Sequence, residues 1–260
     1  MKLTEIFGEA IRHSDKLVEL HDRLTTRNQR RIRPEWSKRF YAARLTDWPM
    51  RDGLWRSKND TILIVGTKNA GLSHKDFASD ALLVFLRVAL VMAMAAIDKV
   101  LHEAVSRRFV ALVKKEKLDK LVDLELSKAY RIAIEARARE GKGGRIRKRP
   151  GPKIKAEALE KLYRESFLSL RRLHEICSAC GKKTILERFG NILKPRRSSK
   201  YLHEEWSRLY ARRNQIAHEC DIVRKSRARK IHLHMDSTSD LKNDIRLVRN
   251  FGEFLARELE

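Results

Sequence analysis

Cysteine is scarce in this chain, which has three cysteines among its 260 residues. An odd number of thiols cannot pair completely, and disulfide frameworks are typical of short secreted chains that are rich in cysteine. The N-terminal segment MKLTEIFGEAIRHSDKL also lacks the continuous hydrophobic region of a secretory signal, because Glu5, Glu9 and Asp15 interrupt it. We therefore expect a protein of the reducing cytoplasm without a disulfide framework.

Acidic residues are few relative to basic ones, with 34 Asp and Glu against 58 Lys and Arg and a formal net charge of +24. This excess favours a polyanionic partner, and nucleic acid is the first candidate. An acidic membrane surface would attract the same charge, but there is no run of about 18 uncharged apolar residues, since Arg87 and Asp98 interrupt the most apolar stretch. We expect that stretch to be a buried core helix and the protein to have no membrane partner.

The chain is 42% apolar and 35% charged, which is typical of a globular fold rather than a disordered chain. Apolar residues recur at helical intervals along most of it, and this predicts an all-α fold. Pro34 is expected to end the first helix, and Ser237, Thr238 or Ser239 to cap the last one. The predicted helices cover residues 3–33, 80–109, 118–140, 154–179, 184–193, 199–218 and 240–259.

Two short segments depart from the helical pattern. Residues 61–65 read TILIV and residues 231–235 read IHLHM, and both are strand-like. They could pair as a minor two-stranded ribbon beside the helices. His232 and His234 share the polar side of the second segment, where solvent-facing side chains are a more common outcome than a metal site.

Composition divides the chain at about residue 72. Residues 1–72 are expected to form a basic N-terminal helix followed by an irregular extension, because tryptophan, proline and glycine are spread through residues 47–73. Residues 73–260 are expected to form a helical domain. A basic, glycine-rich stretch at about residues 141–153 predicts a mobile loop within it.

Three basic stretches are the predicted contacts with nucleic acid, because clustered cations bind phosphate and neighbouring aromatic rings can stack on bases. One is interleaved with Trp36, Phe40 and Tyr41, one is the glycine-rich loop, and one follows His218. The alternatives are that the aromatic rings dock on the core and that the charges only keep a linker solvated. The predicted contact residues are Arg30, Arg31, Arg145, Arg147, Lys148, Arg149, Arg224, Lys225 and Arg227.

The remaining candidate for a metal site is formed by His174, Cys177 and Cys180, with Cys220 elsewhere in the chain. A single Cys-x2-Cys pair is a weak signal for zinc, because a structural zinc site needs four ligands. A redox pair is an alternative, and small buried residues at a helix end are the more common outcome. We therefore expect no metal and no cofactor.

The segment RRNQIAHE, residues 212–219, combines groups that can cleave RNA without a metal. Asn214 and His218 are four residues apart and share one face of a helix, with Ile216 and Ala217 turned away toward apolar neighbours. Arg213 lies about 140° round the helix from His218, so its arm must wrap toward the imidazole or the helix must deform. Histidine can move a proton near neutral pH and arginine can stabilise a phosphate that gains charge. The alternative is an ordinary polar helix face.

Arg213, Asn214 and His218 match, position by position, a motif that resembles the signature of the HEPN superfamily, in which an arginine precedes a polar residue and then a histidine. The apolar stretch LLVFLRVALVMAMAAIDKVLHEAV, residues 82–105, resembles the long early helix of that superfamily, particularly of its RiboL-PSP-like group. Asp98 corresponds to a supporting acidic position where glutamate is common. The resemblance covers about residue 76 to the C-terminus and leaves residues 1–70 and the basic insertion after Glu140 unexplained.

The resemblance implies a HEPN-like helical bundle that forms a homodimer, with two Arg/His motifs in one composite cleft. It also implies a metal-independent endoribonuclease, of a kind frequent in toxin–antitoxin or phage-defence systems. Arg213, Asn214 and His218 would be catalytic and Asp98 supporting. The cleavage would proceed by attack of the 2′-hydroxyl and leave a 2′,3′-cyclic phosphate. The alternatives are a non-catalytic nucleic-acid-binding protein and an interaction subunit that docks an acidic antitoxin.

Overall fold

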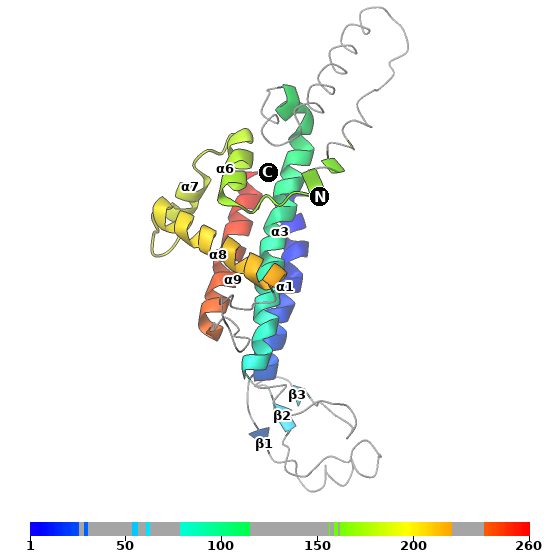
Figure 1. Cartoon of the computed structure of the whole chain (residues 1–260), viewed down its shortest axis with the longest axis vertical. Coiled ribbons are helices and arrows are strands. Elements are labelled where there is room, and N and C mark those ends of the chain that lie inside the picture. Colours follow the sequence, from blue (N-terminus) through cyan, green and yellow to red (C-terminus); the bar gives the residue numbers. More distant parts are fainter. Residues whose placement is uncertain are drawn as a thin grey trace, which may run out of the picture. The chain divides into compact units, whose positions relative to one another are not determined.

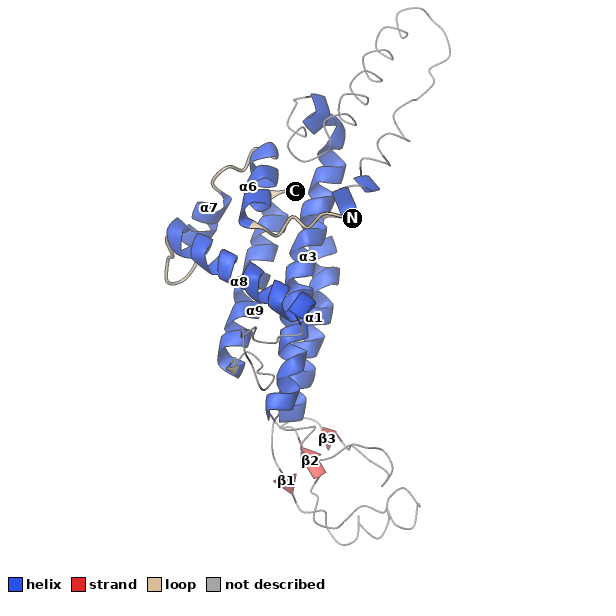
Figure 2. Ribbon diagram, in the orientation of Figure 1, coloured by secondary structure: helices blue, strands red, loops and turns tan. Residues whose placement is uncertain are grey.

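The computed structural model of this chain describes a set of mostly helical segments (Figures 1 and 2). The described residues are 1–25, 29–30, 54–56, 61–62, 79–114, 156, 159–160, 162–219 and 237–260. The helices with described bounds are α1 (Leu3–Thr25), α3 (Ser79–Lys114), α6 (Leu170–Ala179), α7 (Ile185–Ile192), α8 (Ser199–Glu219) and α9 (Thr238–Glu258). The prediction of an all-α fold class is confirmed by these segments.

Contacts divide the chain into two compact units that are each discontinuous in sequence. The larger unit contains Met1–Ile11, Val91–His234 and Asp244–Glu260, and the smaller one contains Arg12–Leu90 and Met235–Asn243. The predicted division at about residue 72 stays a prediction. The α8 motif, Asp98 and the residues that contact them belong to the larger unit.

The core of the larger unit is built on the second half of α3, which is apolar on most of its circumference. Met94, Ile97 and Leu101 are fully buried. Helix α9 approaches α1 closely at Gly252, because a Cβ atom at that position would lie 2.2 Å from Cε2 of Phe7. A glycine in a helix interior costs about 1 kcal/mol relative to alanine, and here it provides the space that the phenylalanine ring fills.

Three aromatic rings join α7, α8 and α9. Phe189 and Trp206 each meet Phe251 edge-on, with ring centroids 5.1 and 4.9 Å apart. The indole N–H of Trp206 donates a hydrogen bond of 2.7 Å to the buried carbonyl of Leu168. These contacts fix α8 in position and orientation within the larger unit, because aromatic packing is directional and a buried indole N–H requires a partner.

Two helix predictions need correction. The first helix ends at Thr25 rather than at residue 33, and Gln29–Arg30 form a strand. Thr25 Oγ1 donates to the carbonyl of His21, and a hydroxyl that bonds back to the backbone in this way weakens helix continuation. The predicted helix 154–179 is broken at residues 164–169, after which Ser169 caps α6 by accepting a hydrogen bond from Arg172 N. The predicted helix 118–140 lies outside the described residues.

The smaller unit contains a three-stranded antiparallel sheet in the order β1 (Gln29–Arg30), β2 (Leu54–Arg56) and β3 (Thr61–Ile62). The strand predicted at 61–65 is therefore present in its first two residues. It pairs with β2, where Trp55 lies opposite Ile62. The predicted partner, residues 231–235, lies outside the described residues, so that pairing stays a prediction. Within the same unit, Ser14 Oγ of α1 donates to the carbonyl of Ala89 of α3 at 2.8 Å.

Helix α3 is long and apolar enough to cross a membrane, since an 18-residue stretch within Ala81–Phe109 has a mean hydropathy of 2.2. Half of that stretch is buried within the protein. A single helix of this kind is weak evidence for a membrane span, because the central helix of a bundle has the same length and composition.

Candidate active site

The candidate site is presented by the C-terminal half of α8. Leu202, Trp206 and Leu209 are buried and recur at helical spacing, and they anchor one side of α8 against the core. Arg212 continues this buried side, with 8% of its surface exposed. The next residues, Arg213, Asn214 and His218, lie on the remaining, more open sides of the helix (Figure 1 shows the course of α8).

Arg213 and His218 come together although they are five residues apart. Arg213 Nη1 lies 3.4 Å from Nε2 of His218, and the same Nη1 donates a hydrogen bond of 3.0 Å to Oδ1 of Asn214. Helix α8 is α-helical throughout Ser199–Glu219. Of the two arrangements expected for Arg213, the structure has the first: the arm of the arginine wraps round the helix, and the backbone does not deform.

The geometry defines which nitrogen of His218 can act as a base. A guanidinium only donates hydrogen bonds, so Nε2 of His218 is the accepting, unprotonated nitrogen in this contact. The His218 side chain is exposed, whereas Arg213 is partly covered and its Nε is buried without a hydrogen-bond partner among the described residues. An exposed base beside a partly desolvated, permanently charged group is an arrangement that suits a phosphodiester substrate.

Two neighbours of the motif differ from expectation. Ala217 is exposed and Ile216 is only half-buried, although both were expected to face apolar neighbours. The apolar side of α8 is instead supplied by residues from Leu202 to Leu209, so the last turns of the helix are held less by core packing. This leaves the helix face that carries Asn214 and His218 open to a ligand or a partner.

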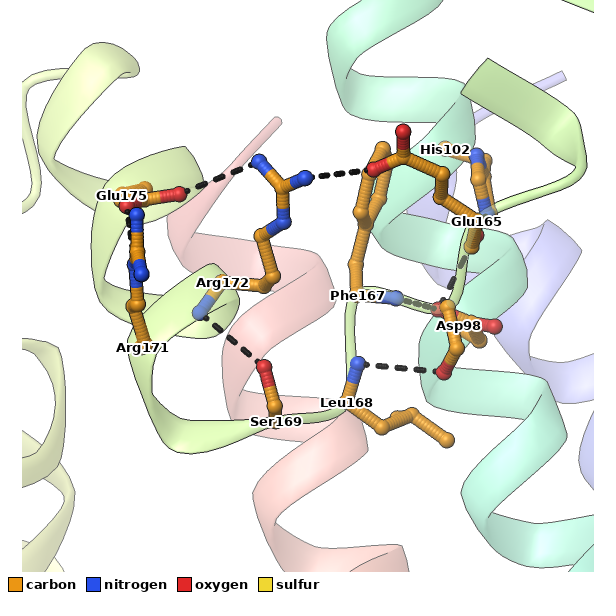
Figure 3. Close-up of polar contacts among 10 residues, drawn as sticks. Asp98, His102, Glu165, Phe167, Leu168, Ser169, Arg171, Arg172 and Glu175 are labelled. Carbon is orange, nitrogen blue, oxygen red and sulfur yellow. Dashed lines mark hydrogen bonds and ion pairs between the residues drawn. The ribbon is translucent and has the colours of Figure 1, made fainter. Parts of the chain in front are cut away.

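Asp98 of α3 is largely buried, with 20% of its side chain exposed. Its Oδ1 accepts a hydrogen bond of 2.7 Å from the backbone N–H of Phe167, in the non-helical segment before α6 (Figure 3). One turn along α3, His102 Nε2 donates to the carbonyl of Glu165 at 3.0 Å and lies 3.8 Å from Asp98 Oδ1. A carbonyl accepts only, so this nitrogen of His102 carries a proton.

Asp98 and His102 therefore hold the segment that leads into α6. The ring of His102 also stacks on Phe167, with centroids 4.1 Å apart. Beyond this point Arg172 lies between two carboxylates, with Nη2 2.6 Å from Glu165 and Nη1 3.3 Å from Glu175 (Figure 3). These contacts explain why the chain leaves the helical path at residues 164–169.

Burial dominates the titration of both α3 side chains. It raises the pKa of Asp98 above the ordinary value of 3.8, while the hydrogen bond from Phe167 and the charges of His102 and Arg213 oppose this increase. Burial lowers the pKa of His102 below 6.5, and the charge of Asp98 opposes the decrease. Asp98 was expected either to pair with a functional Arg or His or to face solvent near Lys99 and His102. It bonds to the backbone amide of Phe167 and lies 3.8 Å from Nε2 of His102, and Arg213 acts on it electrostatically.

The predicted nucleic-acid contacts fall mainly where the structure is not described. Arg31, Arg145, Arg147, Lys148, Arg149, Arg224, Lys225 and Arg227 lie outside the described residues, as do Cys220, His232 and His234. Arg30 belongs to β1, where its backbone pairs with Leu54. The roles predicted for these residues stay predictions.

The two described cysteines are not joined to each other. Cys177 is buried and its thiol is free, and Cys180 is half-buried. Burial raises the pKa of the Cys177 thiol to about 12. The thiol therefore stays protonated near neutral pH, and a protonated thiol is a poor metal ligand. No group of three or more metal-ligating side chains occurs in the described part of the chain.

His174 has a different partner from the one its spacing suggested. Its Nε2 lies 3.0 Å from Nε2 of His203 on α8, so one nitrogen donates and the other accepts. This pair joins residues 29 positions apart, and no local motif indicates it. Burial, followed by the nearby charge of His203, lowers the pKa of His174 below 6.5.

The apolar contact between α7, α8 and α9 encloses space of about 10 Å³, lined by residues such as Phe189, Trp206 and Phe251. That is room for about one water molecule, so this pocket is too small for a nucleotide or a cofactor. No protein-family model, curated protein or solved structure matches the chain.

Proposed function

We propose that this protein is a metal-independent endoribonuclease of HEPN type, which acts in the cytoplasm as a homodimer and serves as a toxin or phage-defence effector. The observation that supports it best is the contact between Arg213 Nη1 and His218 Nε2 on an open face of α8. The net charge of +24 supports RNA as the substrate.

In the proposed reaction, Nε2 of His218 takes the proton of a 2′-hydroxyl. The freed oxygen attacks the adjacent phosphorus, and the bond to the 5′-oxygen of the next nucleotide breaks. The leaving oxygen takes a proton from the imidazolium of a second copy's His218, which gives a 2′,3′-cyclic phosphate and a 5′-hydroxyl end. Arg213 donates to the phosphate oxygens as they gain charge, and Asn214 orients Arg213 through their 3.0 Å hydrogen bond.

Asp98 has a supporting role in this proposal. Its carboxylate accepts the hydrogen bond from Phe167 and so holds the segment before α6. The negative charge of the same carboxylate also attracts the guanidinium of Arg213. It would therefore stabilise the position of the guanidinium rather than touch the substrate. Removing it would change the rate less than removing Arg213 or His218.

Cleavage of end-labelled RNA in excess EDTA tests the proposal, with the wild type, His218→Ala and His13→Ala compared at equal concentration. His13 is an exposed histidine on α1, so its variant is a matched control for loss of an imidazole. We expect cleavage by the wild type and the control, and a loss of about 10² or more in rate for His218→Ala. Equal rates for all three proteins would show a contaminating nuclease and would contradict the proposal.

A non-catalytic nucleic-acid-binding protein is the second candidate. It is favoured by exposed cations such as Arg196 and Arg197, which form no ion pair among the described residues and would contact phosphate whether or not His218 reacts. RNA binding that survives His218→Ala, with no cleavage by the wild type, would establish this function. Co-purification with an acidic protein would instead favour an interaction subunit that docks an antitoxin.

A further inference from the structure

A compact basic surface lies at the turn between α7 and α8 and is distinct from the stretches expected from sequence. It consists of Lys194, Arg196, Arg197, Lys200 and Tyr201, here called the α7–α8 patch, and all five residues are exposed. Tyr201 is 37% exposed. The guanidinium carbon of Arg197 lies 4.9 Å from the centroid of the Tyr201 ring, so the cation stacks on the aromatic face.

The four cations of the patch differ from other exposed arginines of the same unit. Arg164, Arg171 and Arg257 are 76%, 85% and 72% exposed, and each pairs with a glutamate one helical turn away. No acidic side chain forms an ion pair with the patch cations within the part of the chain that the structure describes. Four positive charges within seven residues thus have no acidic partner among the described residues, and a polyanion would supply one.

The patch is held in place by backbone contacts. Arg197 N donates a hydrogen bond of 3.1 Å to the carbonyl of Gly190 in α7. A Cβ atom at Gly190 would lie 2.2 Å from the carbonyl oxygen of Arg197, so the turn packs directly on the helix. Ser198 Oγ accepts from Tyr201 N at 3.1 Å and caps α8, so the first turn of the helix already has an internal partner. A ligand would therefore contact the side chains of the patch rather than the helix terminus.

We propose that the α7–α8 patch binds single-stranded RNA and delivers it along α8 to His218. Phosphates would contact Arg196, Arg197 and Lys200, and a base would extend the stack of Arg197 on Tyr201. An exposed aromatic ring beside cations favours unpaired bases, because a duplex keeps its bases stacked inside. The delivery step rests on the proposed function, whereas the binding step does not.

The geometry of α8 links the patch to the motif. Lys200 and His218 are 18 residues apart, which is about five turns of 3.6 residues, so they lie on the same face about 27 Å apart. Exposed residues between them on this face are Glu204, Ser207 and Ala211, of which two are small. A stacked strand at about 3.4 Å per nucleotide would cover this distance with about eight nucleotides, and an extended strand with fewer.

The test measures binding of a fluorescent RNA strand in which every 2′-hydroxyl is methylated, so that no cleavage by the proposed route can occur. The Arg196→Ala/Arg197→Ala/Lys200→Ala variant is compared with Arg164→Ala/Arg171→Ala/Arg257→Ala, which removes the same charge from paired, exposed sites. We expect the affinity of the patch variant to fall by about tenfold or more. The slope of log affinity against log salt concentration should also become less steep by about two, because each lost phosphate contact removes about 0.7. The control should stay within about twofold.

Tyr201→Leu and Tyr201→Phe separate stacking from charge. We expect Tyr201→Leu to weaken binding of the single strand about fivefold or more and Tyr201→Phe to retain it, with little effect of either on a duplex of equal charge. Equal losses for the patch and control variants would overturn the proposal, because net charge alone would then govern binding. Unchanged RNA binding by the patch variant together with lost binding to polyglutamate would also overturn it in favour of an acidic protein.

Cleavage assays distinguish failure of this proposal from failure of the proposed function. A dinucleotide is too short to reach from His218 to the patch, so the patch variant should cleave a dinucleotide at the wild-type rate. For a long strand, the KM of the same variant should increase about tenfold or more. Cleavage of both substrates with unchanged KM would overturn delivery and leave the ribonuclease intact. Absence of cleavage by every protein, with binding still dependent on the patch, would overturn the ribonuclease and the delivery step and establish the binding step.

Discussion

Asp98 of α3 and Phe167, 69 positions later in the chain, are joined by a hydrogen bond of 2.7 Å from the backbone N–H to Oδ1. A largely buried carboxylate of α3 thereby holds the non-helical segment that leads to the Ser169 cap of α6. The same carboxylate lies in the field of Arg213, so it connects the architecture of the larger unit to the candidate site.

Asp98→Ala should destabilise the protein by about 1–3 kcal/mol, because it leaves the Phe167 amide without its acceptor. Asp98→Asn keeps an oxygen at the same position, so this variant should lose much less stability. Urea unfolding followed by circular dichroism measures both. Equal stability of the two variants would show that the hydrogen bond does not hold this segment.

Arg213→Lys keeps the positive charge but replaces the planar guanidinium, which contacts Asn214 and His218 through one nitrogen, with a single ammonium. We expect kcat to decrease by about 10²–10³ while KM for RNA changes less than threefold, since the lost donors act mainly on the transition state. Steady-state cleavage of a short labelled RNA gives both constants. A change confined to KM would assign Arg213 to binding.

Gly190→Ala and Gly8→Ala should have opposite effects on stability. A Cβ at Gly190 would lie 2.2 Å from the Arg197 carbonyl, whereas a Cβ at Gly8 meets nothing within 4 Å. We expect the first substitution to cost about 1–3 kcal/mol through overpacking and the second to stabilise α1 by about 0.5–1 kcal/mol. Thermal unfolding of both variants measures the difference, and a Gly190→Ala protein as stable as the wild type would contradict the close approach.

The stability of the protein should decrease as pH falls below about 6.5. Burial lowers the pKa values of His102 and His174 in the folded state, so the unfolded chain binds more protons in this range. The stabilisation is fully present above pH 6.5, starts to fall below that value and is lost as pH passes through the folded pKa values.

Melting temperatures between pH 8 and pH 5 test this pH dependence for the wild type, His174→Gln and His13→Gln. His174→Gln removes one of these two groups, so the melting temperature of this variant should decrease less on acidification. The exposed control, His13→Gln, should follow the wild type. Identical pH profiles for all three proteins would show that His174 does not contribute.

The sequence predicted what depends on local pattern. The bounds of α8 and α9 agree with the apolar spacing to within two residues, and Ser237 Oγ accepts from Asp240 N at 3.0 Å as an expected cap. The wrapping of the Arg213 arm was one of two outcomes that the spacing allowed. Local periodicity is sufficient for these features because each is formed within one helix.

Features formed between distant residues could not be predicted in this way. The non-helical segment before α6 bonds to Asp98 of α3, and the pair His174–His203 joins two helices, so neither contact has a signal in the local sequence. The α7–α8 patch was overlooked for another reason. The chain has 58 basic residues, and only the structure distinguishes those that pair with glutamate from those that do not.

The central claim is that the 2′-hydroxyl attacks the neighbouring phosphate with His218 as the base, and the ends of the products report this step most directly. RNA incubated with the wild type in excess EDTA should give fragments that carry 2′,3′-cyclic phosphate and 5′-hydroxyl ends by mass spectrometry. Replacing the sugar at the cleaved position with its 2′-deoxy form should abolish cleavage there. Fragments with 3′-hydroxyl and 5′-phosphate ends, or continued cleavage at the 2′-deoxy position, would contradict the account.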